Sequence, residues 1–492
     1  MEQSGVAPGF REPSLADALL PLGALAVLIA GALALFGLDA LDGPIQVALV
    51  LCCAVAALVA MKNGHSFPAV QEAGRGALGS VTSAIFILFA VGALIGVWNL
   101  SGTIPTLVYY GIQVLSPDWY YAATALICAI VALSIGSSWT TAATIGVGLV
   151  GIASLIGVSP AITAGAVISG AYLGDKTSPL SETTILAAQM VKVDVYEHIR
   201  RQVWTSIPAF VVAFVVFLLL SLTGPDTVTD AETTSDLDKL NQIFNITPLA
   251  LLPLALLAFL SIRRVPASLA LLAATLFAGA LGAFLQPDVY ADFVSGSGSS
   301  LVESLKAVWA AMANGFSMSS GIPDVDRLLS RGGMDSMLLT IWLIVGAVTF
   351  GAMLEEFGLI NRLVHPMITA AKSTGRLYVT VFACGFGLNV VAGDQYIALV
   401  LPSRIFRAEF ARRGLAPTNL SRLAADSGTV TSPLVPWNSC GAFMGATLGV
   451  STLLYLPYAV FCYASPALSV LYGITGFKIE NVEPTADPEE TE

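Results

Sequence analysis

Long apolar segments follow one another along almost the whole chain, and short polar segments separate them. Several of these segments reach the roughly 20 residues that cross a bilayer as a helix, and others are shorter. The pattern therefore predicts a bundle of helices buried in lipid. The apolar runs are 18–38, 44–61, 78–98, 119–134, 142–157, 160–173, 203–222, 248–262, 266–285, 337–354, 377–403, 441–451 and 453–472.

Composition strengthens this picture. Of the 492 residues, 56% are hydrophobic and only 11% are charged, whereas a soluble protein carries roughly 25% charged residues. We therefore predict an all-α polytopic membrane protein whose partner is the lipid bilayer. The net charge of −11 excludes nucleic acid as a partner, since that would require a basic face.

The positions of Lys and Arg predict the topology, because cytoplasmic loops carry the excess of positive charge. With both termini in the cytoplasm, ten crossings place most basic residues inside. This arrangement requires that 119–157 and 377–403 each form a re-entrant hairpin, entering and leaving on one side.

Three short sequences recur at a nearly constant distance, which indicates a duplication. GALIGVWNLSG (92–102) resembles GAVTFGAMLEEFG (346–358), IGSSW (135–139) resembles FGLNV (386–390), and TSPL occurs at 177–180 and at 431–434. Each half then holds five crossings, an odd number, so the second half enters the membrane in the opposite sense. Two inverted-topology repeats are typical of secondary transporters. The predicted divisions are repeat 1 (1–223), an acidic linker (224–245), repeat 2 (246–479) and an acidic tail (480–492).

The two TSPL copies predict helices that break inside the membrane, within 160–190 and 419–450. In each copy a serine, Ser178 or Ser432, precedes a proline, which is the order of a helix N-cap and its first helical residue. Such breaks expose backbone groups that only protein or a wet cavity can satisfy. On this interpretation Asp175 lies in the first break, and Glu182 lies on the first turn of the new half-helix.

Polar residues gather around these predicted breaks and at the hairpin tips. They offer carboxylate, hydroxyl and amide oxygens, which suit a hard cation such as Na⁺ better than zinc or copper. We expect no other cofactor. The residues are Asp175, Glu182, Asp426, Asn438 and Ser439 at the breaks, and Ser137, Ser138, Thr140, Thr141, Asn389, Asp394 and Gln395 at the tips.

A carboxyl group in a poorly hydrated cavity has a raised pKa, and a nearby cation or helix N-terminus lowers it again. A proton and Na⁺ can then compete for the same oxygens at physiological pH, and this competition predicts exchange. Structural roles remain open for these residues. Asp175 and Lys176 can form an ion pair, Glu182 can cap a helix, Asp394 can face the aqueous mouth, and Asp426 can pair with Arg422. Loop positions are expected for His65, His198 and His365.

Five longer stretches are distinctive: GSSWTTAATIGVGLVGIASLIG (136–157), GAVISGAYLGDKTSPLSETT (165–184) and LSRLAADSGTVTSPLVPWNSCGAFMGATLGV (420–450), with LSGTIPTLVYYG (100–111) and GDQYIALVLPSRIF (393–406). Together they resemble the NhaC family of bacterial Na⁺/H⁺ antiporters. The resemblance implies a prokaryotic cytoplasmic membrane, a transport domain that moves against a scaffold, and a homodimer. It points to Asp175, Ser178, Thr183, Thr184, Asn389, Asp394, Asp426, Thr429, Thr431 and Asn438 as the ion site. Glu182 departs from the family, which usually has Asp in SPLSDTT.

The function favoured by the sequence is exchange of Na⁺ for H⁺, carried out by a transporter and not by an enzyme. The alternative keeps the fold but moves an organic anion, of the malate/lactate kind, or an amino acid. Lys176 is the one basic residue in the predicted core that could hold a carboxylate substrate, which favours a bare cation. An intramembrane protease with paired aspartates would need a glycine where Tyr172 and Val391 stand. A channel is disfavoured because no ring of selectivity residues is visible.

Overall fold

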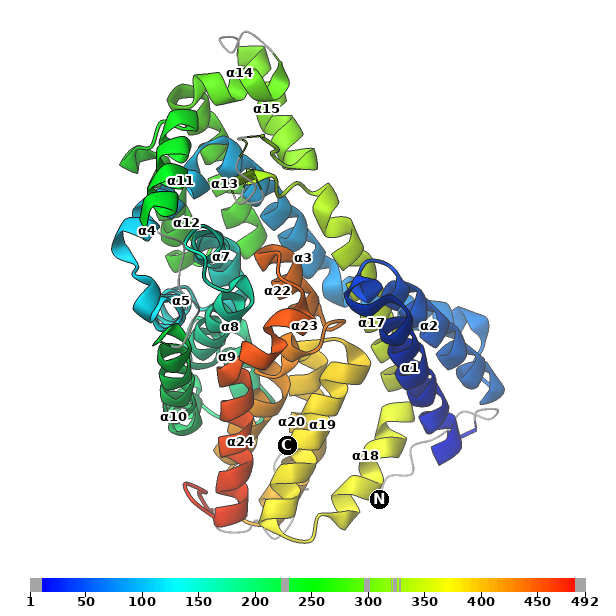
Figure 1. Cartoon of the computed structure of the whole chain (residues 1–492). Coiled ribbons are helices and arrows are strands. Elements are labelled where there is room, and N and C mark those ends of the chain that lie inside the picture. Colours follow the sequence, from blue (N-terminus) through cyan, green and yellow to red (C-terminus); the bar gives the residue numbers. More distant parts are fainter. Residues whose placement is uncertain are drawn as a thin grey trace.

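The protein is described by a computed structural model that covers residues 11–222, 230–295, 301–319, 321, 325–326 and 329–482. These residues form helices joined by short turns, with two isolated β-bridges (Figure 1). The α-helices are α1 (Leu15–Phe36), α2 (Pro44–Lys62), α3 (Phe67–Leu100), α4 (Thr103–Val114), α5 (Tyr120–Ile135), α6 (Ser138–Thr141), α7 (Val147–Leu155), α8 (Pro160–Thr177), α9 (Glu182–Met190), α10 (Val195–Leu222), α11 (Asp230–Ile243), α12 (Leu252–Ile262), α13 (Ala267–Leu285), α14 (Pro287–Val294), α15 (Leu301–Asn314), α17 (Leu338–Glu356), α18 (Leu359–Ala370), α19 (Thr374–Ala392), α20 (Gln395–Arg412), α21 (Pro417–Ala424), α22 (Ser439–Leu448), α23 (Thr452–Tyr455) and α24 (Val460–Thr475).

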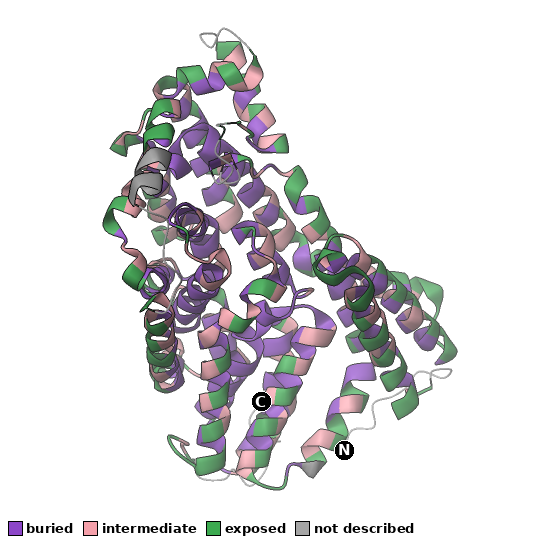
Figure 2. Cartoon of the chain, viewed as in Figure 1, coloured by how far each residue is buried: buried purple, intermediate pink, exposed green. Residues whose placement is uncertain are grey.

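The helices confirm a polytopic membrane protein. Within the described residues, nine helical segments are long and apolar enough to cross a bilayer, or up to eleven if two sharply bent pairs each count as one span. Exposed residues are common along α1, α2 and α10, whereas α7 and α8 are buried among other helices (Figure 2). Since the exposed residues of these outer helices include many large apolar ones, we infer that the outer helices face lipid.

A helix pair and a helix break lie where the first hairpin and the first broken helix are predicted, and the re-entrant course of the pair stays a prediction. α5 ends at Gly136, which adopts a positive φ of 78°, and the chain returns through α6, a π-helical turn (142–146) and α7. The break between α8 and α9 lies at 178–181. Asp175 was expected in the break but lies in the last turn of α8, because the Ser178 N–H still donates to the Gly174 carbonyl.

The cap residue of the first break also differs from the prediction. Ser181, not Ser178, caps α9, since its hydroxyl accepts from the Thr184 N–H at 3.3 Å. Ser178 ends α8 and donates to the Leu133 carbonyl at 2.9 Å. Glu182 lies on the first turn of α9, as predicted.

The second hairpin and break follow the same order. α19 ends at Gly393, with a φ of 63°, and Asp394 caps α20. α21 continues into a π-helical turn (425–429), a short 3₁₀ turn covers 432–434, and Asn438 caps α22. The tip was expected at FGLNV as well as at Asp394. In the structure only Gly393 and its neighbours form it, and Asn389 lies inside α19.

Glycines let the first hairpin and the first broken helix pack closely. A Cβ atom at Gly170 or Gly174 would overlap the backbone of α5, so only glycine permits this approach. A Cβ at Gly136 would lie 2.6 Å from Leu180 in the break. The hairpin tip is thereby held against the point where α8 ends.

The order of elements supports the duplication without testing its inverted orientation, which stays a prediction. Gly102 separates α3 from α4 with a φ of 76°, and Gly358 separates α17 from α18 with a φ of 71°. A hairpin and a broken helix follow in both halves. The predicted linker (224–245) contains α11, while 223–229 and the tail after residue 482 lie outside the described residues.

Candidate functional site

The carboxylate of Asp175 is surrounded by hydroxyl groups. Ser138, at the first hairpin tip, donates to Oδ2 at 2.6 Å, and Ser181 donates to Oδ1 at 2.5 Å. Thr183 also donates to Oδ1 at 3.2 Å, and Thr184 donates to the backbone carbonyl of Asp175 at 2.8 Å. Three hydroxyl oxygens and two carboxylate oxygens therefore converge where the hairpin meets the break.

Asp175 lies on the wall of a cavity of about 490 Å³. Both hairpin tips, the start of α9, the middle of α3 and the turn between α12 and α13 enclose it. Arg264, in that turn, is the one basic residue among the lining residues. The predicted site residues that line it are Ser137, Ser138, Thr140, Asp175, Glu182, Thr183, Asp394, Gln395 and Ser439.

Two further carboxylates face this cavity. Asp394 is 8% exposed, and its Oδ1 accepts from the backbone N–H groups of Tyr396 and Ile397 at 2.8 and 3.0 Å. Glu182 is exposed and accepts from the Tyr396 hydroxyl at 3.1 Å. Asp394 therefore combines a capping role with a position on the cavity wall, and the Glu182–Tyr396 contact joins the two halves.

Around the second break the polar groups are neutral and bonded to one another. Asn389 donates to the Gly428 carbonyl at 2.6 Å and to the Thr431 hydroxyl at 2.9 Å. Asn438 donates to Asn389 Oδ1 at 3.0 Å. The buried Thr429 hydroxyl has no hydrogen-bond partner among the described residues. The structure thus joins Asn389, Thr431 and Asn438, outside the cavity lining.

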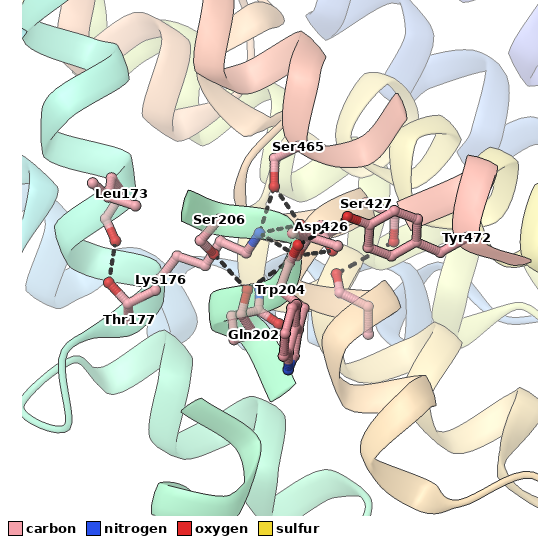
Figure 3. Close-up of polar contacts among 12 residues, drawn as sticks. Leu173, Lys176, Thr177, Gln202, Trp204, Ser206, Asp426, Ser427, Ser465 and Tyr472 are labelled. Carbon is pink, nitrogen blue, oxygen red and sulfur yellow. Dashed lines mark hydrogen bonds and ion pairs between the residues drawn. The ribbon is translucent and has the colours of Figure 1, made fainter. Parts of the chain in front are cut away.

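Asp426 is also placed away from the cavity. It pairs with Lys176, and both side chains are fully buried (Figure 3). Ser465 donates to Asp426 Oδ1 at 2.6 Å and Thr205 donates to Oδ2 at 3.1 Å. Asp426 lies in the π-helical turn, a deformation that is frequent at functional sites.

Two of the simpler alternatives are resolved by these contacts. Asp175 and Lys176 are neighbours in sequence, yet Asp175 binds hydroxyls at the cavity and Lys176 reaches Asp426 in the second half. Arg422, four residues before Asp426, donates through Nη1 to the Lys478 carbonyl at 3.2 Å. The sequence proposed Lys176 as a charge partner without deciding which carboxylate it pairs with. In the structure this carboxylate is Asp426.

The expectation that His198 is a loop residue is wrong. His198 lies on the first turn of α10, is fully buried, and its Nδ1 is 2.9 Å from the Ser421 hydroxyl. The missed signal is the series His198, Gln202 and Thr205, which recurs at helical spacing.

The described residues hold no group of three or more His, Cys, Asp or Glu side chains suited to a metal. The oxygen atoms around Asp175 come from one carboxylate and from hydroxyls, a set that suits a hard cation such as Na⁺.

Comparisons with known proteins match this chain to the Na⁺/H⁺ antiporter family over residues 19–187 and 170–477. The Na⁺/H⁺ antiporter NhaC of Alkalihalophilus pseudofirmus is 37% identical over 88% of this chain and 91% of the relative. The arginine/ornithine antiporter ArcD of Halobacterium salinarum is 34% identical over 98% and 96%, respectively. The malate-2H⁺/Na⁺-lactate antiporter of Bacillus subtilis is 32% identical over 95% and 96%.

Proposed function

The chain belongs to the Na⁺/H⁺ antiporter family, and from this premise we propose that it exchanges Na⁺ for H⁺ across the cytoplasmic membrane. The observation that carries the proposal is the buried Asp175 carboxylate with its three hydroxyl donors on a cavity wall. A hydroxyl can donate to a carboxylate or turn a lone pair toward a cation. The same group of oxygens can therefore serve both states of the exchange.

In the proposed cycle, Na⁺ binds Asp175 together with Ser138, Ser181 and Thr183, while a proton occupies the carboxyl group in the sodium-free state. Oxygen ligands of this kind suit a hard cation. Glu182 and Asp394 add negative charge to the cavity and raise the local concentration of cations. The cycle runs by alternating access, in which a transport domain moves against a scaffold, as the family resemblance implies.

The remaining predicted ligands have a structural role in this proposal. Asn389, Asn438 and Thr431 are bonded to one another near the second break, Thr429 is buried close to them in sequence, and Ser178 holds the first break against α5. We propose that they fix the geometry of the tips. We also propose that both termini are cytoplasmic and that two chains form a homodimer, as the family resemblance implies.

The test is reconstitution into liposomes that contain a pH-sensitive dye. Addition of NaCl alone should move protons, and Asp175→Asn should abolish the response. Glu72→Gln is the matched control, because Glu72 is an exposed carboxylate on α3 that pairs only with Arg75 in the described contacts. Full Na⁺-driven proton movement by Asp175→Asn would refute the proposed site.

A second candidate is exchange that includes an organic solute. The cavity of about 490 Å³ is far larger than a bare Na⁺, and Arg264 at its wall offers a donor for a carboxylate. Relatives named for arginine, ornithine, malate and lactate make these solutes the ones to test. KCl, malate, lactate, arginine and ornithine are added in turn, and a response that requires one of the organic solutes would favour this second function.

A further inference from the structure

The wall of the cavity carries charges of both signs. The charged residues that line it are Asp175, Glu182, Asp394 and Arg264. The three carboxyl groups come from the two sides of the first break and from the second hairpin tip, whereas Arg264 comes from the turn between α12 and α13. A cation that enters the cavity is therefore attracted by several groups and repelled by one.

The guanidinium of Arg264 keeps its full charge toward the cavity. It forms no ion pair with any residue that the structure describes, whereas Arg201 and Arg413, for example, pair with carboxylates. The Arg264 side chain is exposed and borders the cavity. Its positive charge therefore acts on any ion that occupies the cavity, with an energy proportional to the charge of that ion.

The backbone at Arg264 has a conformation that favours glycine. Where α12 ends, the Arg264 N–H donates to the Ser261 carbonyl at 2.9 Å and the Val265 N–H donates to the Leu260 carbonyl at 3.1 Å. Glycine usually takes the place of Arg264 in such a turn, because the position is left-handed, and Arg264 has a φ of 58°. Among the four described non-glycine residues with a positive φ, Arg264 is the one that lines this cavity. A strained position beside a candidate site points to a use of the side chain.

The oxygen atoms of the cavity suit divalent cations as well as Na⁺. Ca²⁺ takes about six to eight oxygen ligands in flexible geometry, and carboxylates are its preferred ligands. The cavity offers three carboxyl groups and several hydroxyls within about 490 Å³, which leaves room for such an ion. A positive charge on the wall opposes a divalent ion about twice as strongly as a monovalent one, because Coulomb energy scales with charge. Arg264 therefore discriminates between the two kinds of ion.

We propose that Arg264 is a specificity-determining residue that disfavours divalent cations in the Asp175 cavity. The inference rests on the function proposed above, and specifically on its Na⁺ site. Na⁺ binds in spite of Arg264, because Asp175 and its hydroxyls hold the ion directly. A divalent ion bears double the repulsion and gains less from the site. Arg264 contacts no bound ion in this scheme and acts through the charge that it places on the cavity wall.

The experiment measures Na⁺ and Ca²⁺ binding to the purified whole chain by isothermal titration calorimetry at low ionic strength. Arg264→Gln should strengthen Na⁺ binding about threefold, the scale of an exposed charge interaction. It should strengthen Ca²⁺ binding about tenfold, because the change in the logarithm of affinity doubles with the charge of the ion. Both gains should shrink when choline chloride is added, since the Arg264 side chain is exposed to solvent and its charge is screened by salt.

Arg263→Gln is the matched control, because Arg263 carries the same charge at the preceding position. It lies outside the cavity lining, and its Cζ is 5.0 Å from the centroid of the Phe259 ring. This control should change both affinities by less than about twofold. Arg264→Lys retains the charge and should retain the wild-type preference for Na⁺. If Arg264→Gln does not fold, Arg264→Gly replaces it, because glycine adopts a positive φ without strain.

Three outcomes would overturn the role of Arg264. Equal gains for Na⁺ and Ca²⁺ would indicate a change of geometry instead of charge, and equal gains in Arg263→Gln would indicate a general surface effect. An unchanged Ca²⁺ affinity in Arg264→Gln, with loss of a response to malate, lactate or arginine, would assign Arg264 to an organic solute. The exchange itself is tested separately. A wild type that binds Na⁺ but moves no protons would refute the exchange and leave the discrimination against Ca²⁺ standing.

Discussion

Asp175 and Asp426 are both buried aspartates near the end of a helix that precedes a break, yet their surroundings differ. Asp175 receives hydrogen bonds from hydroxyl groups and lies on a cavity wall, whereas Asp426 is paired with a lysine and sealed from the cavity. Hydroxyls can rotate away from a carboxylate, but a buried ammonium must be compensated. The comparison shows that the groups bonded to a buried carboxylate decide whether a cation can take their place.

Replacement of Asp175 provides the strongest test of this comparison. Asp175→Asn should lower Na⁺-driven exchange at least about 100-fold, because no carboxylate remains among the hydroxyls. Stability should change little, since the hydroxyls can rotate to accept from the new amide. Exchange rates in liposomes and the Tm in detergent measure the two effects. A large loss of Tm would mean that Asp175, like Asp426, is needed for the stability of the fold.

Asp426→Asn should show the opposite pattern. Removing one partner of a buried ion pair leaves Lys176 uncompensated, which costs about 3–5 kcal/mol. The Tm in detergent should fall sharply, and Lys176→Met in the same chain should restore most of it. If the single variant is as stable as the wild type, the Lys176–Asp426 pair does not contribute to the stability of the fold.

The hydroxyls around Asp175 can be removed one at a time. Ser138→Ala and Ser181→Ala each delete a hydrogen bond to a charged group, worth about 1.5–3 kcal/mol. We expect each to weaken apparent Na⁺ affinity about tenfold or more. Ser134→Ala is the control, because the exposed Ser134 hydroxyl bonds to a carbonyl of its own helix. An unchanged affinity in both test variants would remove the hydroxyls from the ion site.

Glu182 and Tyr396 should matter less, because their contact is solvent-exposed. Tyr396→Phe removes the hydroxyl and leaves the ring, and should alter apparent Na⁺ affinity by less than about fivefold. Glu182→Gln tests the added negative charge of the cavity, and its effect should shrink as ionic strength rises. An effect of Glu182→Gln as large as that of Asp175→Asn would shift the centre of the site to Glu182.

The smallest effect is expected at Glu409, beyond the second hairpin. Hydrogen bonds from Arg412 lower the pKa of the Glu409 carboxyl below its ordinary value of 4.5. The charged pair therefore stabilises the fold above about pH 4.5, and this contribution is lost as pH falls through the lowered pKa. Glu409→Gln should reduce the Tm by about 1 °C at pH 7. The wild type and the variant should converge in acid, and a difference that grew in acid would contradict the assignment.

The sequence predicted the class of fold and the positions of both hairpins and both breaks, because apolar length and the TSPL repeats are local signals. It predicted Ser178 and Ser432 as the caps of the new helices, whereas Ser181 caps α9 and Asn438 caps α22. The Ser-Pro order alone does not show which N–H groups are left free by the preceding helix. It grouped Asp175 and Asp426 in one site because both are acidic and lie near breaks. In the structure the Lys176 side chain reaches Asp426 and not Asp175, so the two aspartates have different surroundings.

The burial of His198 on α10 was missed for a related reason. His198 follows Asp194 and precedes Arg200 and Arg201, so the local charge pattern is that of a surface turn. α10 packs against α21 and α24, which are distant in sequence, and His198 in its first turn contacts Ser421 of α21. The amphipathic spacing of His198, Gln202 and Thr205 was the one available signal.

The bond between Lys176 and Asp426 has a mechanical consequence. It joins α8 to the π-helical turn that follows α21, so we expect these two elements to move together. A covalent crosslink engineered between them should leave turnover intact. A crosslink across the cavity, from the middle of α3 to α9, should arrest it.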